Sequence, residues 1–156
     1  MANAANATET VVERELMIAA SPETVWDLLV DPDKASAWMG LQSWSEPKPG
    51  GLYRVEVIPG KIARGEYVEL DPPNRLVFTW GWEGDDGPVG AGSSTIEFEL
   101  SVDGDGTRLR FVHSGLPSAE AAGSHAHGWD HYFERLAIAA RGGDPGADPW
   151  LTGDMS

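Results

Sequence analysis

Residues 96–113 of the chain have the sequence IEFELSVDGDGTRLRFVH, and their pattern decides the fold. Apolar or aromatic side chains recur at every second position on both sides of a central Asp-Gly-Asp-Gly stretch, at Ile96, Phe98, Leu100 and Val102 and again at Leu109, Phe111 and His113. A period of two is typical of a strand with one buried face, and Asp-Gly is common in tight hairpin turns. These residues therefore predict an antiparallel hairpin with a ring-rich buried face.

The same period continues upstream, from residue 43 to residue 95. The buried face is predicted to carry Tyr53, Val55 and Val57 from one strand and Leu76, Phe78, Trp80 and Trp82 from another. Turn-forming residues separate the runs at 48–51, 59–60, 71–74 and 84–87. Region 43–114 therefore predicts an antiparallel meander.

The run from residue 61 to residue 70 alternates poorly, because Arg64 and Glu66 fall on the same side as apolar residues. A bulge at Gly65 would turn both charged side chains to solvent, and we favour this interpretation. Alternatively, the two side chains face inward as an ion pair, since a buried charge needs a partner.

A first strand is predicted at 11–20, and a helix is predicted to begin at Ser21-Pro22-Glu23. Serine can cap a helix, proline suits its first position and glutamate favours the positive end of its dipole. The helix would bury Val25, Trp26, Leu28 and Leu29. Asp31-Pro32-Asp33 is expected to end it and to start a second short helix toward Trp38 and Met39.

The C-terminal part of the chain predicts one long helix, capped by Ser118 and reaching about Ala140. One face of it carries Trp129, Tyr132, Phe133, Leu136 and Ala140, so we expect this face to lie on the sheet. Gly142-Gly143 stops the helix. We divide the chain into a flexible tail at 1–10, a single domain at 11–141 and a Gly/Asp/Pro-rich tail at 142–156.

Composition excludes several classes of protein. Among the 156 residues, 41% are hydrophobic and 23% are charged, as in an ordinary globular domain. The net charge of −14 disfavours nucleic-acid binding, and the absence of cysteine excludes thiolate chemistry. No apolar stretch is long enough to span a membrane and no secretion signal is present, so we expect a cytoplasmic protein.

Several local motifs occur in a fixed order along the chain. They are Ala20-Ser21-Pro22-Glu23-Thr24-Val25-Trp26, Asp31-Pro32 leading to Trp38, Gly50-Gly51-Leu52-Tyr53, the stretch 65–80 (GEYVELDPPNRLVFTW), Gly106-Thr107-Arg108-Leu109, and His125 with Gly128-Trp129. With these motifs the chain resembles the START-like (SRPBCC) superfamily, in the branch named for the activator of the heat-shock protein 90 ATPase. The resemblance covers about residues 11–140.

This resemblance implies an α+β helix-grip fold, with a curved antiparallel sheet of about six or seven strands around the long C-terminal helix. Members of the superfamily bind lipids, hormones or polyketides, some cyclise or hydrate them, and some are partners of other proteins. Three hypotheses follow: a binder of a small hydrophobic or aromatic molecule, a polyketide cyclase- or hydratase-like enzyme, and a chaperone-associated interaction module. We favour the binder over an enzyme, expect no cofactor and leave a homodimer or protein partner open.

A sheet curled around a helix leaves a space in which a small molecule can bind. Aromatic rings offer flat ligands a stacking surface. The predicted ligand-binding residues are Trp38, Met39, Tyr53, Trp80, Trp82, Phe111, His113, His125, Trp129 and Phe133. The alternative is that these rings fill the interior completely.

Two histidines are candidates for acid–base chemistry, because the pKa of imidazole lies near neutral pH. His113 follows the inward side of its strand, and His125 lies one helical turn before Trp129. We favour a buried histidine satisfied by hydrogen bonds for each of them, and predict no catalytic residue beyond these two weak candidates.

A metal site is not predicted. Helical spacing places His127 and His131 on one face, but the glutamate of a zinc-binding helix is missing. The same face carries Glu134 and Arg135, which indicates solvent. Asp103-Gly104-Asp105-Gly106 is interpreted as a hairpin turn rather than a calcium loop.

Overall fold

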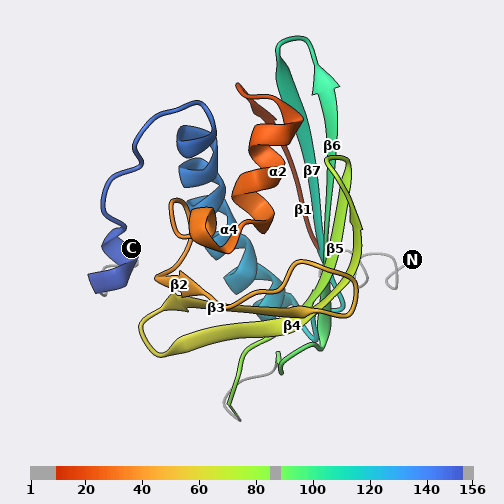
Figure 1. Cartoon of the computed structure of the whole chain (residues 1–156). Coiled ribbons are helices and arrows are strands. Elements are labelled where there is room, and N and C mark those ends of the chain that lie inside the picture. The colour runs from red at the N-terminus through yellow and green to blue at the C-terminus, as the bar shows by residue number, and fades with distance from the viewer. Residues whose placement is uncertain (1–9, 85–88, 153–156) are drawn as a thin grey trace.

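The computed structural model describes residues 10–84 and 89–152. A seven-stranded antiparallel sheet has the order β1-β7-β6-β5-β4-β3-β2. Its strands are β1 (Val12–Ile18), β2 (Gln42–Ser43), β3 (Leu52–Ile58), β4 (Lys61–Asp71), β5 (Arg75–Trp80), β6 (Ser94–Asp103) and β7 (Gly106–Ser114). The helices are α2 (Pro22–Val30), α3 (Pro32–Ala35), α4 (Ala119–Ala140) and the 3-10 helix η1 (Pro149–Thr152). Figure 1 shows the sheet curling around α4.

The predicted hairpin is confirmed as β6 and β7. Phe98 pairs with Phe111 and Ile96 pairs with His113, so the alternating side chains lie on one buried face. Val102 is the exception, because it is 72% exposed. It lies near the turn, where the hairpin extends beyond α2 and is not covered by a helix (Figure 1).

Strand β4 corrects the prediction of a bulge at Gly65. Its pairing with β3 is continuous through Tyr53 and Gly65, and its register with β5 shifts instead between Tyr67 and Glu69. Glycine is required at position 65 for another reason: a Cβ there would lie 1.8 Å from the carbonyl oxygen of Thr79. Gly65 therefore lets β5 approach closely.

The two charged residues that break the pattern of β4 face solvent. Arg64 and Glu66 are exposed, as we favoured, while Ala63 and Tyr67 on the other face are buried. The inward ion pair between Arg64 and Glu66 is not formed; Arg64 instead pairs with Glu83 at 3.4 Å. Ala63 and Gly65 add little side chain to the inward face and the apolar Val68 is exposed on the other face, which explains why the alternation is hard to recognise.

The helix ends follow the predicted capping. The Ser21 hydroxyl accepts a hydrogen bond from the Thr24 amide at 3.3 Å, and Asp31 caps α3 through the Asp33 amide at 2.9 Å. At α4, the Ser118 hydroxyl accepts from the Ala121 amide at 3.1 Å. The predicted apolar faces are buried: Val25, Trp26, Leu28 and Leu29 in α2, and Trp129, Tyr132, Phe133, Leu136 and Ala140 in α4.

Aromatic rings join α4 to the sheet. The ring centroid of Phe111 lies 4.8 Å from that of Phe133 and 4.9 Å from that of Trp129. The ring centroids of Trp129 and Trp80 lie 5.1 Å apart. All four side chains are buried. The sheet and the long helix therefore enclose one ring-rich interior, as the alternating strands predicted.

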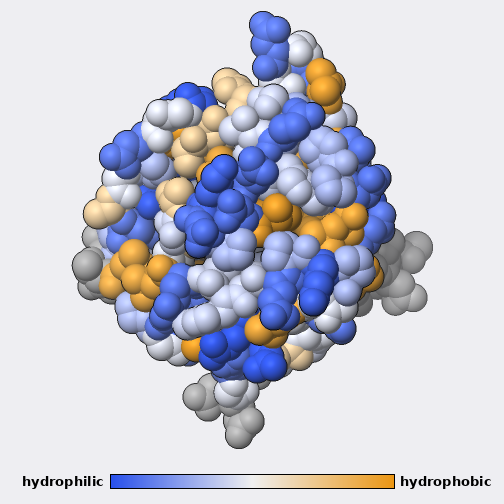
Figure 2. Space-filling model, viewed as in Figure 1, coloured by the Kyte–Doolittle hydropathy of each residue, from blue (hydrophilic) through white to orange (hydrophobic). Residues whose placement is uncertain are grey.

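The surface offers little apolar area on the face shown in Figure 2, where hydrophilic residues predominate and hydrophobic ones form separate groups. Exposed large hydrophobic residues are Met17, Leu41, Trp44, Val68 and Val102. No helix in the described part of the chain is long and apolar enough to cross a membrane. The curled sheet, the long C-terminal helix and the two short helices after β1 together form the α+β helix-grip fold.

Candidate functional site

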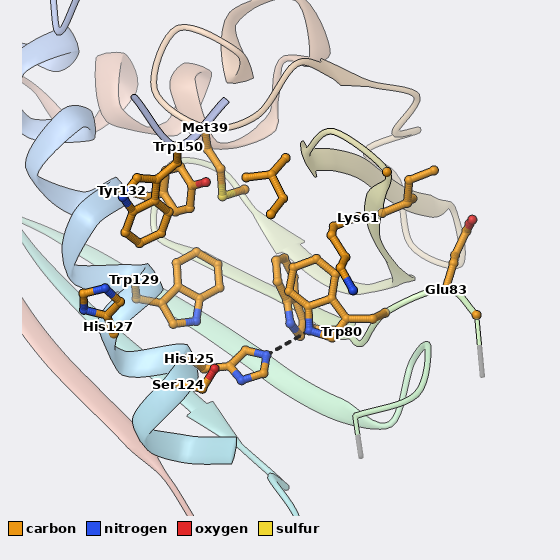
Figure 3. A pocket seen from close by; sticks show the side chains of 16 residues that line it. Met39, Lys61, Trp80, Glu83, Ser124, His125, His127, Trp129, Tyr132 and Trp150 are labelled. Atoms are coloured by element: carbon orange, nitrogen blue, oxygen red, sulfur yellow. Dashed lines mark hydrogen bonds between the residues drawn. The ribbon is translucent and has the colours of Figure 1, made fainter. Parts of the chain in front are cut away.

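A cavity of about 550 Å³ lies between the sheet, α4 and the C-terminal segment, residues 144–151, and is partly open to solvent. Figure 3 shows side chains from these elements converging on it. Its lining consists of Met39, Ile58, Gly60, Lys61, Ile62, Trp80, Trp82, Glu83, Gly84, Ser124, His125, His127, Gly128, Trp129, Tyr132 and Trp150. The volume falls within the range of small-molecule sites.

Two neighbouring indoles form the sheet side of the cavity. Trp80 ends β5, and Trp82 follows after Gly81, with ring centroids 5.3 Å apart in an edge-to-face arrangement. A Cβ at Gly81 would lie 1.6 Å from the carbonyl oxygen of Gly90, so only glycine allows the chain to pass here. The Trp-Gly-Trp sequence therefore turns two rings toward the interior at the end of the strand.

His113 lies beneath this wall in a complete hydrogen-bond chain. The indole N–H of Trp129 donates to its Nδ1 at 3.1 Å, and its Nε2 lies 2.8 Å from the Ser94 hydroxyl. Ser94 donates in turn to the carbonyl oxygen of Trp80 at 2.7 Å, which assigns the ring proton of His113 to Nε2. Burial, with a smaller contribution from His125, lowers the pKa of His113 to about 3, so the ring is neutral.

His125 belongs to the cavity wall itself. Its Nδ1 donates to the carbonyl oxygen of Ala121 at 2.9 Å, and its Nε2 accepts from the indole N–H of Trp82 at 3.1 Å (Figure 3). Burial lowers the pKa of His125, although the hydrogen bond to Ala121 opposes this. A neutral imidazole here fixes the orientation of Trp82.

Two polar atoms of the lining have no partner among the described residues: the indole nitrogen of Trp80 and the hydroxyl of Tyr132. Burial raises the pKa of Tyr132 well above its usual value, and the charge of Asp148 adds to this. Both atoms have almost no accessible surface, so they are unsatisfied groups within the wall and do not face the open space of the cavity.

Charged side chains gather at the edge of the cavity. Glu83 is held by Arg54 at 2.6 Å and by Arg64 at 3.4 Å, and the hydrogen bond from Arg54 lowers the pKa of the Glu83 carboxyl. Lys61 begins β4 and is exposed. Its ammonium group has no carboxylate within 4.0 Å among the described residues. This edge therefore offers a free cation.

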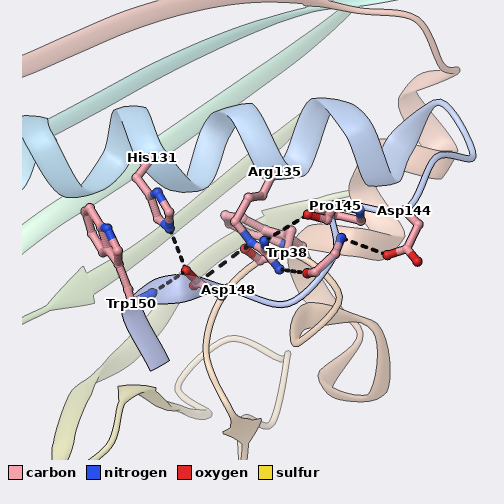
Figure 4. Close-up of polar contacts among 8 residues, drawn as sticks. Trp38, His131, Arg135, Asp144, Pro145, Asp148 and Trp150 are labelled. Carbon is pink, nitrogen blue, oxygen red and sulfur yellow. Dashed lines mark hydrogen bonds and ion pairs between the residues drawn. The ribbon is translucent and has the colours of Figure 1, made fainter. Parts of the chain in front are cut away.

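The C-terminal segment contributes Trp150 to one side of the cavity, and Figure 4 shows the polar contacts that join this segment to α4. The ring of Trp150 stacks on His131 with centroids 3.7 Å apart and planes 6° apart. Nε2 of His131 lies 2.9 Å from Oδ1 of Asp148, whose side chain is 3% exposed. Trp150, in a tail without periodicity, thus becomes part of the lining.

Arg135 holds the same segment against α4 through hydrogen bonds. This corrects the expectation that the helix face carrying Glu134 and Arg135 is open to solvent. The Arg135 side chain is only 12% exposed, because it donates to the carbonyl oxygens of Gly146 at 3.0 Å and of Trp38 at 3.1 Å. The segment thereby covers part of α4. Glu134, by contrast, is exposed as expected.

Of the ten residues that the sequence singled out for ligand binding, five line the cavity: Met39, Trp80, Trp82, His125 and Trp129. The other five are buried away from it: Trp38, Tyr53, Phe111, His113 and Phe133. Tyr53 stacks on Phe78 at 4.1 Å, and the indole of Trp38 donates to the carbonyl oxygen of Leu28. A shared buried face does not distinguish side chains that fill the core from those that border a cavity.

Several lining residues were missed by the sequence analysis as ligand contacts. Tyr132 was recognised only as part of the apolar face of α4, and Ile58, Ile62 and Gly128 carried no distinguishing pattern. Trp150 could be placed only by the tertiary fold. The described residues contain no cluster of three His, Asp or Glu side chains suited to a metal, and the predicted tail at 1–10 lies outside them except for Thr10.

Comparison with known proteins agrees with this architecture. An AHSA1-like protein from Rhizobium etli is 47% identical, with 90% of this chain and 87% of that one covered and a TM-score of 0.72. DynU16, from the dynemicin biosynthetic locus, is 25% identical over 87% of this chain and 49% of its own, with a TM-score of 0.73. The Aha1 dimer from Colwellia psychrerythraea is 20% identical, with 84% of this chain and 96% of that one covered and a TM-score of 0.72.

The curled sheet and the gripped helix place the chain in the START-like (SRPBCC) class of folds. Residues 19–141 match the family model of activator of Hsp90 ATPase homolog 1-like proteins, and the chain belongs to this family. No match was found among the curated proteins.

Proposed function

We propose that the chain binds a small hydrophobic or aromatic molecule in the cavity between the sheet and α4. The observation that carries this proposal is that four indoles, those of Trp80, Trp82, Trp129 and Trp150, border a space of about 550 Å³. Such rings supply a large apolar surface and a stacking geometry for flat molecules. The relationship to DynU16, from a biosynthetic locus, is consistent with a small-molecule ligand.

Catalysis has weaker support than binding. Both ring nitrogens of His113 are engaged, by Trp129 and Ser94, and its side chain is fully buried. His125 would have to release the indole of Trp82 before its Nε2 could take a proton from a ligand. A cyclase- or hydratase-like activity, a protein partner and a cytoplasmic location stay predictions.

The cavity can be filled from α4 without disturbing the helix. A Cβ at Gly128 meets no atom within 4 Å, and Gly128 belongs to the lining. Gly123 lies in the same helix, is exposed and is equally free of contacts, but it does not line the cavity. Gly128→Leu therefore places an isobutyl group in the cavity, and Gly123→Leu is its matched control.

The test is isothermal titration calorimetry with 2-naphthol, a neutral flat probe. We expect the unmodified chain and Gly123→Leu to bind it with the same affinity and Gly128→Leu to lose binding by tenfold or more, about 1.4 kcal/mol. Circular dichroism verifies that both variants are folded. Equal binding by both variants, or no binding of 2-naphthol by the unmodified chain, would refute the proposal.

A further inference from the structure

The edge of the cavity carries a cation, Lys61, that no carboxylate of the described residues neutralises, in a chain whose overall charge opposes anions. The chain has a net charge of −14, yet the ammonium group of Lys61 has no carboxylate within 4.0 Å among the described residues. Figure 3 shows the Lys61 side chain extending from the start of β4 toward the tryptophan pair at Trp80. Because Lys61 lies among the lining residues, its charge faces the ligand space.

Two carboxylates of the described residues near Lys61, those of Glu83 and Glu56, are engaged by other groups. Glu83 forms ion pairs with Arg54 and Arg64. Glu56 accepts hydrogen bonds from the Gly60 amide at 3.2 Å and from Gln42 at 3.1 Å. These contacts leave the charge of Lys61 available to a bound anion.

A second polar group lies deeper in the lining. The indole N–H of Trp80 is a donor without a partner among the described residues, and the side chain is 2% exposed. A donor of this kind is satisfied by an oxygen acceptor and not by an apolar group or a cation. This nitrogen has almost no accessible surface, so a ligand oxygen reaches it only if the ring turns, and the ligand chemistry is set by the cation at the edge.

We propose that the preferred ligand is a flat aromatic carboxylate, with its ring among the indoles and its charged group at Lys61. This proposal rests on the proposed function and specifies the ligand class of the same site. Lys61 is a specificity-determining residue in this account. The net negative charge of the chain repels anions, so any preference for an anionic ligand has to come from a local positive charge such as that of Lys61.

The test compares 2-naphthoate with 2-naphthamide, which has the same shape without the charge, by isothermal titration calorimetry at neutral pH. We expect the unmodified chain to bind 2-naphthoate about threefold more tightly, as for a partly exposed ion pair. Lys61→Gln should remove this preference, so that 2-naphthoate and 2-naphthamide bind equally. Lys48→Gln removes the same charge outside the lining and should keep the preference.

The outcomes separate the two proposals. Tight binding of 2-naphthamide with equal or weaker binding of 2-naphthoate would overturn the role of Lys61 and leave the cavity as a binding site for neutral aromatics. Equal loss of preference in Lys61→Gln and Lys48→Gln would attribute it to overall charge and also overturn the proposal. Failure of both probes to bind would refute the proposed function as well. Added salt should reduce the preference, because the ion pair is exposed.

Discussion

The indole N–H of Trp129 donates a hydrogen bond to Nδ1 of His113 across 3.1 Å and thereby ties α4 to β7. Both side chains are buried, and the chain of donors continues through Ser94 to the backbone of Trp80. The cavity wall and the helix that covers it are thus held in one fixed relationship.

Trp129→Phe keeps an aromatic ring but removes the donor to His113. An unsatisfied buried nitrogen costs about 1–3 kcal/mol, so we expect the free energy of unfolding to fall by that amount. Urea denaturation followed by circular dichroism measures it. Trp44→Phe is the control, since Trp44 is 39% exposed and should change stability by about 0.5 kcal/mol or less. Equal losses in both variants would contradict the hydrogen-bond chain.

His113 should stay neutral over a wide range of pH, because its pKa falls from the ordinary 6.5 to about 3 in the folded chain. Between these two pH values the unfolded chain binds more protons than the folded chain. The contribution of His113 to the free energy of unfolding is therefore greatest above about pH 6.5 and decreases as the pH drops toward 3. His125, with a lowered pKa, acts in the same direction. NMR titration of the His113 ring should show no midpoint near 6.5; such a midpoint would contradict its burial.

Two glycines should respond in opposite ways to the same substitution. Gly128→Ala adds a methyl group where no atom lies within 4 Å, in a helix that favours alanine, and should stabilise the chain by about 0.5–1 kcal/mol. Gly65→Ala forces a Cβ toward the Thr79 carbonyl oxygen and should destabilise it by more than about 2 kcal/mol. Thermal unfolding compares the two; a tolerated Gly65→Ala would argue against the close approach of β5.

Trp150→Ala tests whether the C-terminal segment is fastened through its stacking on His131. We expect faster hydrogen exchange in residues 144–151, while exchange in β6 and β7 stays unchanged. The loss of stability should be smaller than the roughly 3–5 kcal/mol of a central tryptophan, because we expect this segment to open locally while the sheet and α4 stay folded. Slow exchange in the segment after the substitution would show that Arg135 and Asp148 suffice to hold it.

The fold was largely predictable because its determinants are local. Alternation in residues 96–113 placed the hairpin correctly, and Ser21, Asp31 and Ser118 marked the helix starts through short-range hydrogen bonds. The bulge near Tyr67 was misplaced because the steric need for Gly65 arises from a neighbouring strand. Sequence spacing carries no information about such contacts.

The candidate site was less predictable, because periodicity shows which face is buried and not where the sheet and helix separate. Phe111 and Trp80 share the buried face, yet only Trp80 borders the cavity. Trp150 lies in a tail rich in Gly, Asp and Pro, where no periodicity identifies a contact. Its place beside His131 follows from the tertiary structure alone.

The most direct test of the binding cavity uses the seven tryptophans as reporters. In a titration of the 15N-labelled chain with 2-naphthol, we predict that the indole N–H resonances of Trp80, Trp82, Trp129 and Trp150 shift in proportion to occupancy. Those of Trp26, Trp38 and Trp44, which do not line the cavity, should stay in place. Unchanged resonances of the four lining indoles at saturating probe, or shifts confined to Trp44, would contradict the account.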